Sequence, residues 1–255
     1  MVTNVPEPEP DADLGILVGL IVTDGSIGEK EIEFTGKSKR LHKIFEELMR
    51  KKFGVKKFWR GNDSRDKEIK RTKVFGKKIS KDLREVTKNF SEWVFKLKKE
   101  EIRRILQVMF STDGCITLWP VWNRKKGVWE IKKCVKFTSK SKHLREVLFK
   151  MLTALGFQPT ERENNDEVVL FKKEDIIKFA KEIGFVPGVK VTKNSRNWHG
   201  FEKNQVLDLA VKAFELKKKD LENFKTKEEV IDFLKSLLKA PASDCKRPRV
   251  QVPTD

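Results

Sequence analysis

The hydrophobic positions of this chain follow a helical spacing in two separate stretches. In each stretch, apolar residues recur at positions i, i+3, i+4 and i+7, which is typical of a helix that buries one face. The first set is Leu41, Ile44, Phe45, Leu48 and Met49, and the second is Leu144, Val147, Leu148, Met151 and Leu152. Gly54 and Gly156 stand where a C-terminal glycine cap would end each helix. The pattern therefore predicts two similar amphipathic helices.

The segments before the two predicted helices also match each other. Residues 34–41 read FTGKSKRL and residues 137–144 read FTSKSKHL, which are identical at six of eight positions. Further upstream, residues 17–25 read LVGLIVTDG and residues 106–114 read LQVMFSTDG. Matches that recur in the same order indicate an internal repeat. Each copy runs from an apolar helix through Asp-Gly to a strand ending in Phe-Thr, and then to the amphipathic helix.

Each amphipathic helix is followed by a pattern that predicts a strand and a further helix. The approximate ranges are 67–75 and 79–90 in the first copy, and 167–171 and 175–183 in the second. Each copy is then an αββαββα unit. The predicted fold class is α+β, with two pseudo-symmetric repeats, the apolar helices packed at the centre and antiparallel sheets forming a saddle. Beyond Trp198 the repeat stops, and helices are expected near 207–216 and 227–238.

These patterns divide the chain into five segments. An acidic, proline-rich tail (1–13) precedes a first repeat (14–99) and a second repeat (100–199), and a helical extension (200–240) and a mobile tail (241–255) follow. The start is too acidic for a signal peptide, and no apolar run reaches the roughly 18 residues of a membrane helix. The sequence therefore predicts an intracellular, cytoplasmic protein without a membrane partner.

The second copy contains an insertion. The two Asp-Gly aspartates are 89 positions apart (113 minus 24), whereas the two Phe-Thr pairs are 103 apart (137 minus 34), which leaves 14 extra residues in the second copy. They fall around 119–133, with a basic turn formed by Arg124, Lys125, Lys126 and Gly127. This pattern predicts a lengthened β-hairpin.

The charge of the chain points to an anionic partner. Lys and Arg total 56 against 38 Asp and Glu, for a net charge of +18. Nucleic acid fits this excess, because basic side chains that neutralise phosphates release counterions. A lysine-rich surface of a heat-adapted protein would also fit it. The three cysteines lack CxxC spacing, which argues against a zinc site. The absence of tyrosine excludes tyrosine-dependent nucleases, and the three histidines are not at ligand spacing.

The two apolar stretches resemble the signature helices of the LAGLIDADG homing endonucleases, in the single-chain form with two motifs. The run EEIRRILQVMFSTDG at 100–114 is similar to the approach to the second motif in archaeal intron and intein enzymes, and the resemblance covers about 14–199. Val22 and Ser111 stand where the family has its first motif Asp, and Val108 replaces the motif glycine that Gly19 retains.

The resemblance implies a monomeric endonuclease from a prokaryotic, archaeal source that cuts both strands of double-stranded DNA across the minor groove. An intron-encoded enzyme is favoured, because no N-terminal Cys or Ser and no C-terminal His-Asn mark an intein. The alternative is a non-cleaving relative that assists RNA splicing or regulates transcription. Such proteins can lose the motif aspartates, whereas both are present here.

Asp24 and Asp113, eighth in each motif, are the candidate metal ligands. Gly15 and Gly19 are one turn apart and would let the two motif helices pack closely, with Gly19 facing Val108. The helix ends and both carboxylates would then meet, against the negative ends of two helix dipoles. A divalent cation would offset that charge, and hard oxygen ligands select Mg²⁺ or Mn²⁺. Ordinary helix-ending Asp-Gly turns explain one copy more readily than both.

Two further sequence features bear on nuclease chemistry. The triplets at 68–70 and 130–132 fit the Glu-x-Lys half of a restriction-type motif, but they lack a repeated context in a chain with 37% charged residues. The resemblance also implies a catalytic lysine on a loop after the last helix of each repeat. The candidates are Lys96 and Lys98, which lie 72 and 74 residues past Asp24, and Lys190 and Lys193, which lie 77 and 80 past Asp113.

Strand alternation assigns one face of each predicted sheet to DNA. In the second repeat the opposite face is apolar except for Lys133. The predicted DNA contacts are Glu31, Glu33, Thr35, Lys37, Lys70 and Arg71 in the first repeat, and Arg124, Lys125, Lys126, Glu130, Lys132, Lys136, Thr138 and Lys140 in the second. Since lysine pairs with guanine and an acid with cytosine, the two halves predict an asymmetric target. Trp119, Trp122 and Trp129 are expected to clasp the hairpin rather than to stack on bases.

Overall fold

The computed structural model describes residues 10–64, 66–193 and 195–238. Within them the chain forms two successive αββαββα units, which confirms the predicted architecture. The first unit comprises α1 (Ala12–Asp24), β1 (Gly25–Ile27), β2 (Glu31–Gly36), α2 (Lys39–Phe53), β3 (Trp59–Asn62), β4 (Lys70–Phe75) and α3 (Lys77–Lys88). The second comprises α5 (Lys99–Thr112), β5 (Gly114–Asn123), β6 (Val128–Thr138), α6 (Lys142–Ala154), β7 (Thr160–Arg162), β8 (Glu167–Leu170) and α7 (Lys173–Glu182).

Short helices and an extension complete the chain. They are α4 (Phe90–Trp93) and η1 (Val94–Lys96) between the units, η2 (Glu163–Asn165) within the second, and α8 (Lys203–Lys212), η3 (Lys218–Asp220) and α9 (Lys227–Ser236) after it. Helix α1 begins inside the tail that the sequence assigned to 1–13, whereas the tail assigned to 241–255 lies outside the described residues. No helix of the described residues is long and apolar enough to cross a membrane.

The two sheets share one topology and one register. Their strand orders are β1-β2-β4-β3 and β5-β6-β8-β7, with every pairing antiparallel. Gly25 pairs with Phe34 in the first sheet, and Gly114 pairs with Phe137 in the second. The repeated sequence motif therefore marks structurally equivalent positions, because both phenylalanines are fully buried against the helices.

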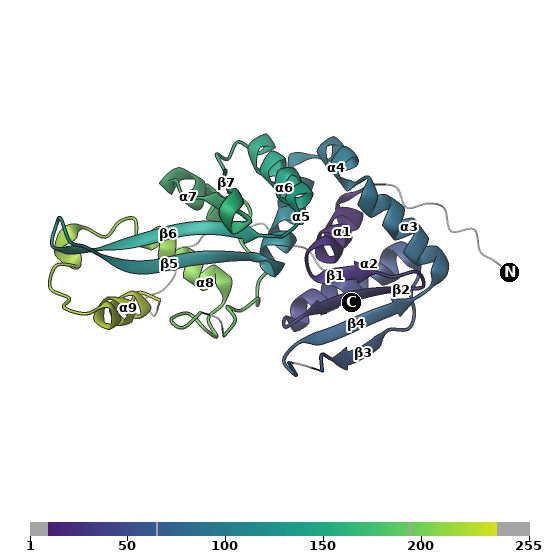
Figure 1. Cartoon of the computed structure of the whole chain (residues 1–255), viewed down its shortest axis with the longest axis horizontal. Helices are drawn as coiled ribbons and strands as arrows, with labels where there is room; N and C mark the ends of the chain where they lie inside the picture. The colour runs from purple at the N-terminus through teal and green to yellow at the C-terminus, as the bar shows by residue number, and fades with distance from the viewer. Residues whose placement is uncertain (1–9, 65, 194, 239–255) are drawn as a thin grey trace.

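Helices α1 and α5 pack side by side between the two units, as Figure 1 shows. A Cβ atom placed on Gly15 would lie 2.3 Å from Ile105 Cδ1, and one on Gly19 would lie 3.2 Å from Met109 Cγ. Both contacts advance by four residues in the same direction, so the helices run parallel and end together. The prediction that Gly19 faces Val108 was wrong. The i, i+4 row of Ile105 and Met109 faces the glycines instead.

The glycine of each Asp-Gly pair is required by a close approach between helix and strand. A Cβ on Gly25 would come within 2.7 Å of Ile21 Cα, and one on Gly114 within 2.5 Å of Phe110 O. The chain turns directly from the last helical turn into a strand at both places, and a side chain would collide with the helix backbone. This turn holds the preceding aspartate at the end of each motif helix.

The hairpin of β5 and β6 projects away from the central helices, and α9 lies beside its far part (Figure 1). The long hairpin predicted from the insertion is present, and Asn123 pairs with Val128 at its end. Trp129 Nε1 donates to the carbonyl oxygen of Phe224 at 3.0 Å, and Lys227 Nζ lies 3.0 Å from the centre of the Trp119 ring. The tryptophans therefore clasp the hairpin to the C-terminal extension.

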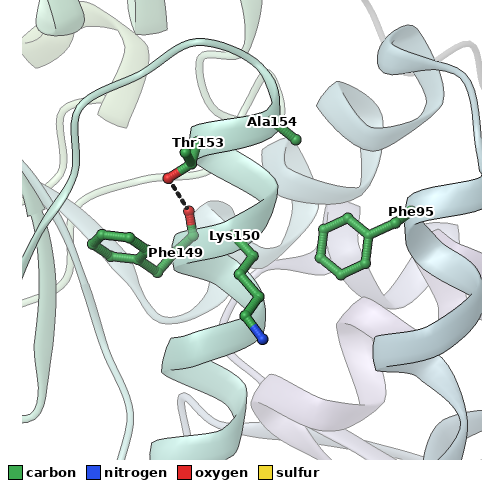
Figure 2. A pocket seen from close by; sticks show the side chains of 5 residues that line it. All are labelled: Phe95, Phe149, Lys150, Thr153 and Ala154. Carbon is green, nitrogen blue, oxygen red and sulfur yellow. Dashed lines mark hydrogen bonds between the residues drawn. The ribbon is translucent and has the colours of Figure 1, made fainter.

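Figure 2 shows an apolar pocket formed by η1 and α6. Phe95 lines one side of it, and Phe149, Lys150, Thr153 and Ala154 line the other. Phe95 lies just before the start of α5, which places the pocket near the opposite end of that helix from Asp113.

Candidate metal centre and nucleic-acid interface

The ends of the two motif helices bring Asp24 and Asp113 together. Asp24 is the last residue of α1, and Asp113 caps α5. Burial raises the pKa of Asp24 to about 6. Burial and the charge of Asp24 raise the pKa of Asp113 to about 7, and the cation of Lys203 opposes both increases. Because burial hinders the ionisation of both carboxyls and the charge of Asp24 further hinders that of Asp113, a bound cation would stabilise the ionised pair.

The donor set fits a hard divalent cation. No ion pair with a basic side chain is seen for either carboxylate within the described residues, so their oxygens are available as ligands. The described part of the chain also contains no group of three or more His, Cys, Asp or Glu side chains suited to a metal. Mg²⁺ is commonly held by one or two carboxylates, with water and substrate phosphate completing its shell. Two aspartates therefore fit an ion whose remaining ligands come from a nucleic-acid backbone.

A buried lysine lies directly beneath this pair. Lys203 begins α8 and is only 7% exposed. Its ammonium donates to the carbonyl oxygens of Ser111 at 2.8 Å and Gly114 at 2.6 Å, on either side of Asp113. Burial lowers the pKa of Lys203 to about 8, which leaves it a cation at neutral pH. No sequence signal marks Lys203, because it lies beyond the repeat and matches no motif.

In the first sheet the predicted acidic contacts are ion-paired. Glu33 is 6% exposed, its Oε2 accepts from Arg71 Nη2 at 2.9 Å, and Lys73 Nζ lies 3.1 Å away. The hydrogen bond from Arg71 is the main reason that the pKa of Glu33 falls to about 2. Thr35 donates to the same carboxylate at 3.0 Å, and Glu31 pairs with Lys73 at 3.2 Å. The oxygens of Glu33 therefore already have donors, and its ion pair holds Arg71 in place. A contact between Glu33 and a base stays a prediction.

The second sheet repeats this ion pair with the charges exchanged. Lys136 precedes Phe137 as Glu33 precedes Phe34, and it pairs with Glu167. Glu167 lies opposite Thr138, as Arg71 lies opposite Thr35. Equivalent positions on the two sheets therefore carry opposite charges in the same cross-strand contact.

Residues 100–184 match a family model described as a LAGLIDADG-like domain. The structure of the I-LtrWI LAGLIDADG homing endonuclease bound to target DNA is 14% identical, with a TM-score of 0.50, over 88% of this chain and 97% of that one. Residues 100–184 therefore resemble a LAGLIDADG-like domain, and the chain has the LAGLIDADG fold. The predicted resemblance and fold class are therefore confirmed.

Two other solved structures are similar to this chain. A variant of I-SmaMI is 10% identical, with a TM-score of 0.50, over 89% of this chain and 99% of its own. A variant of I-DmoI in complex with its target DNA and manganese is 19% identical over 66% of this chain and 91% of its own, with a TM-score of 0.48. No curated protein sequence matches the chain.

The four lysines predicted to be catalytic lie in different parts of the structure. Lys96 ends η1 and Lys98 caps the start of α5, so a helix of 14 residues, about 20 Å long, lies between them and Asp113. This placement corrects their assignment to the catalytic centre. Lys190 forms an isolated β-bridge with Glu202, immediately before Lys203. Lys193 Nζ lies 3.4 Å from Asp66 in the first repeat.

The remaining predicted DNA contacts lie at the edges and the tip of the LAGLIDADG sheets. Lys37 pairs with Asp66 at 2.9 Å, and its equivalent Lys140 pairs with Asp166 at 2.9 Å. Lys70 donates to Asn62 at 2.8 Å. Exposed members of the second repeat are Arg124, Lys125, Lys126, Lys132 and Thr138, and Glu130 is half-buried. A pocket at the edge of the first sheet is lined by the basic residues Lys39, Lys43, Arg60, Lys70 and Arg71, together with His42, Glu46, Gly61, Asn62 and Thr72.

Proposed function

We propose that this protein is a site-specific double-strand DNA endonuclease that uses Mg²⁺ or Mn²⁺. The observation that carries the proposal is the meeting of Asp24 and Asp113 at the parallel ends of α1 and α5. Each aspartate belongs to one repeat, so two similar half-sites share one centre. The I-LtrWI structure, which contains target DNA, supports nucleic acid as the partner.

Asp24 and Asp113 would hold the metal ions at the centre of the pseudo-twofold arrangement. A divalent cation held by these carboxylates would supply Lewis-acid chemistry, lowering the pKa of a bound water and stabilising the leaving oxygen of a phosphodiester. The aspartates contribute fixed oxygen ligands at the helix ends, while the two sheets hold the duplex so that each strand meets the centre across the minor groove. The proposed working parts are the repeats 14–99 and 100–199, with the extension 200–240 supporting the second.

The experiment that tests this function is cleavage of a randomised duplex library. We expect incubation with Mg²⁺ to produce cuts on both strands at one defined sequence, and chelation of the metal to prevent them. Sequencing of the ends gives the target and the stagger of the two cuts. Retention of specific duplexes with no cut in Mg²⁺ or Mn²⁺ would favour a non-cleaving regulator. Selective retention of structured RNA would favour a splicing role.

The exchanged charges of the two sheets support an asymmetric target. Arg71 and Lys136 each carry a positive group on the proposed DNA face, but from different strands of their sheets. A palindromic duplex would present the same base edges to the two sheets. Arg71 and Lys136 would contact those edges unequally, because they lie on strands that are not equivalent. We therefore propose a monomer that reads a long target with two different half-sites.

The tip of the β5–β6 hairpin is expected to bind phosphates without reading sequence. Arg124, Lys125 and Lys126 are exposed, and the tip is ordered because Asn123 Oδ1 accepts from two backbone N–H groups at 3.1 and 3.2 Å. Replacing the three basic residues by alanine should weaken binding to all duplexes and lower the salt slope by about one per lost contact. The measurement is binding affinity over a range of salt concentrations, with target and unrelated duplexes.

Two controls separate the tip from the rest of the hairpin. Lys150→Ala removes an exposed charge from α6 and should leave the salt slope unchanged. Lys132→Ala removes an exposed lysine nearer the sheet and should instead relax preference at particular base pairs, by about 1–3 kcal/mol. Loss of base preference in the tip variant, with an unchanged salt slope, would contradict the assignment of the tip to phosphates.

A further inference from the structure

Lys203 is the one buried cation that the described residues place against the ends of the motif helices, and the proposed chemistry does not use it. Its ammonium reaches four carbonyl oxygens, with those of Phe110 and Thr112 at 3.4 Å in addition to the two closer contacts to Ser111 and Gly114. These carbonyls form the negative end of the α5 dipole. The ammonium therefore lies where the helix end and the two aspartates all contribute negative charge.

Among the described residues, a lysine caps the end of α5 but not the end of α1. Among the hydrogen bonds of the described residues, the end of α1 receives the Thr23 hydroxyl and the Gly25 N–H but no lysine. Lys203 comes from the extension, which follows the second repeat and has no counterpart after the first. The two halves of an otherwise similar centre are therefore unequal.

We infer that Lys203 is a positioning residue, a built-in counter-cation that holds the end of α5 and keeps the two aspartates together when no divalent cation is bound. A helix cap alone would need only a hydrogen-bond donor. A full charge buried beside two carboxylates also lowers their mutual repulsion, and burying it is favourable only with such partners. The inference deepens the proposed metal centre, and only its Ca²⁺ arm rests on that proposal.

The test is a double-variant cycle on thermal unfolding, without metal and at roughly pH 7.5, where the aspartates are mainly ionised. Lys203→Gln keeps an amide donor but removes the charge. We expect it to lower the melting temperature by roughly 5–10 °C in the parent. In the Asp113→Asn background the same change should cost less than half as much, because the repulsion that Lys203 offsets is already reduced.

Lys133→Gln is a matched control. Lys133 is half-buried, its pKa is also lowered to about 8 by burial, and its ammonium also donates to a backbone carbonyl, that of Ile131 at 3.0 Å. Its loss should therefore lower the melting temperature equally in the parent and in the Asp113→Asn background. Saturating Ca²⁺ should restore more stability to Lys203→Gln than to the parent, since the bound cation replaces the missing charge.

Equal losses for Lys203→Gln in both backgrounds would reduce the residue to a helix cap and overturn the inference. If Lys203→Gln does not fold, recovery of folding in the variant that also carries Asp113→Asn supports the inference, and failure to recover contradicts it. A Ca²⁺ shift in none of the proteins would reject the metal centre, and the metal-free cycle would still decide the role of Lys203.

Discussion

Asp24→Asn and Asp113→Asn are each expected to abolish double-strand cleavage while leaving DNA binding largely intact. Each change keeps the side-chain shape but removes an anionic oxygen ligand from the shared centre. We expect the cleavage rate in Mg²⁺ to fall by at least about 100-fold, equivalent to about 2.7 kcal/mol of transition-state stabilisation. Binding should change by less than about threefold, because phosphate contacts supply most of the affinity. Cleavage and filter-binding assays on the selected target measure the two effects separately.

The control for these variants is Asp232→Asn in α9. The Asp232 side chain is 78% exposed and lies on the C-terminal extension, so its loss should change neither rate nor affinity. Both active-site variants should remain folded, because each removes a carboxylate that burial disfavours in its charged form. Full activity of either variant in Mg²⁺ would reject the metal-ligand assignment.

The order of the elements could be predicted because each copy repeats the same local signals. The Phe34 and Phe137 strands, the glycines after each aspartate and the two amphipathic helices lie at matching positions in sequence and in structure. Periodicity determines which face of a helix or strand is buried, since the core must take up the apolar stripe. A pattern seen twice in one chain identified the pair Asp24 and Asp113 without any knowledge of their spatial contact.

Helix rotation and side-chain pairing were not available from the sequence. The motif could indicate that the helix seam involves Gly19, but not that Met109 rather than Val108 would face it, because both are apolar and buried. Spacing along the chain placed Lys96 in the same class as Lys190, although a helix length separates it from the aspartates. Counting residues past a motif does not indicate which end of a helix a loop occupies.

The charges of the sheet faces show a second limit. Strand alternation predicted that Glu33 and Lys136 point to the same face as their neighbours at i+2, but cross-strand partners decide what they present there. Arg71 neutralises Glu33, and Glu167 neutralises Lys136. The sequence predicted that the two sheet faces carry opposite charges. In the structure both faces carry an ion pair, and they differ in which strand of the pair carries the cation. Such partners depend on register, which only the folded sheets determine.

The stability of the metal-free protein is expected to fall as pH rises from about 4 to about 7, through the two aspartates. Their pKa values in the folded protein, about 6 for Asp24 and about 7 for Asp113, lie above the ordinary value of 3.8. In this window the folded protein keeps protons that the unfolded chain has released, so raising the pH favours unfolding. Ionisation of Glu33 has the opposite effect on stability, because its pKa is lowered in the folded protein. That effect is confined to more acidic conditions.

Comparison with the Asn variants isolates this effect from the rest of the chain. Near pH 4 the parent and Asp113→Asn should have similar melting temperatures in chelator, because the carboxyl is protonated and neutral like the amide. Near pH 8 the variant should melt on the order of 10 °C higher, since about 4 kcal/mol of unfavourable ionisation is removed. Adding Ca²⁺ at that pH should raise the melting temperature of the parent but not of the variant, because ionised carboxylates bind the ion and the amide binds it poorly. A difference between the two proteins that stays constant from pH 4 to pH 8 would mean that Asp113 ionises normally, and the buried pair would then lack the repulsion from which we infer a cation site.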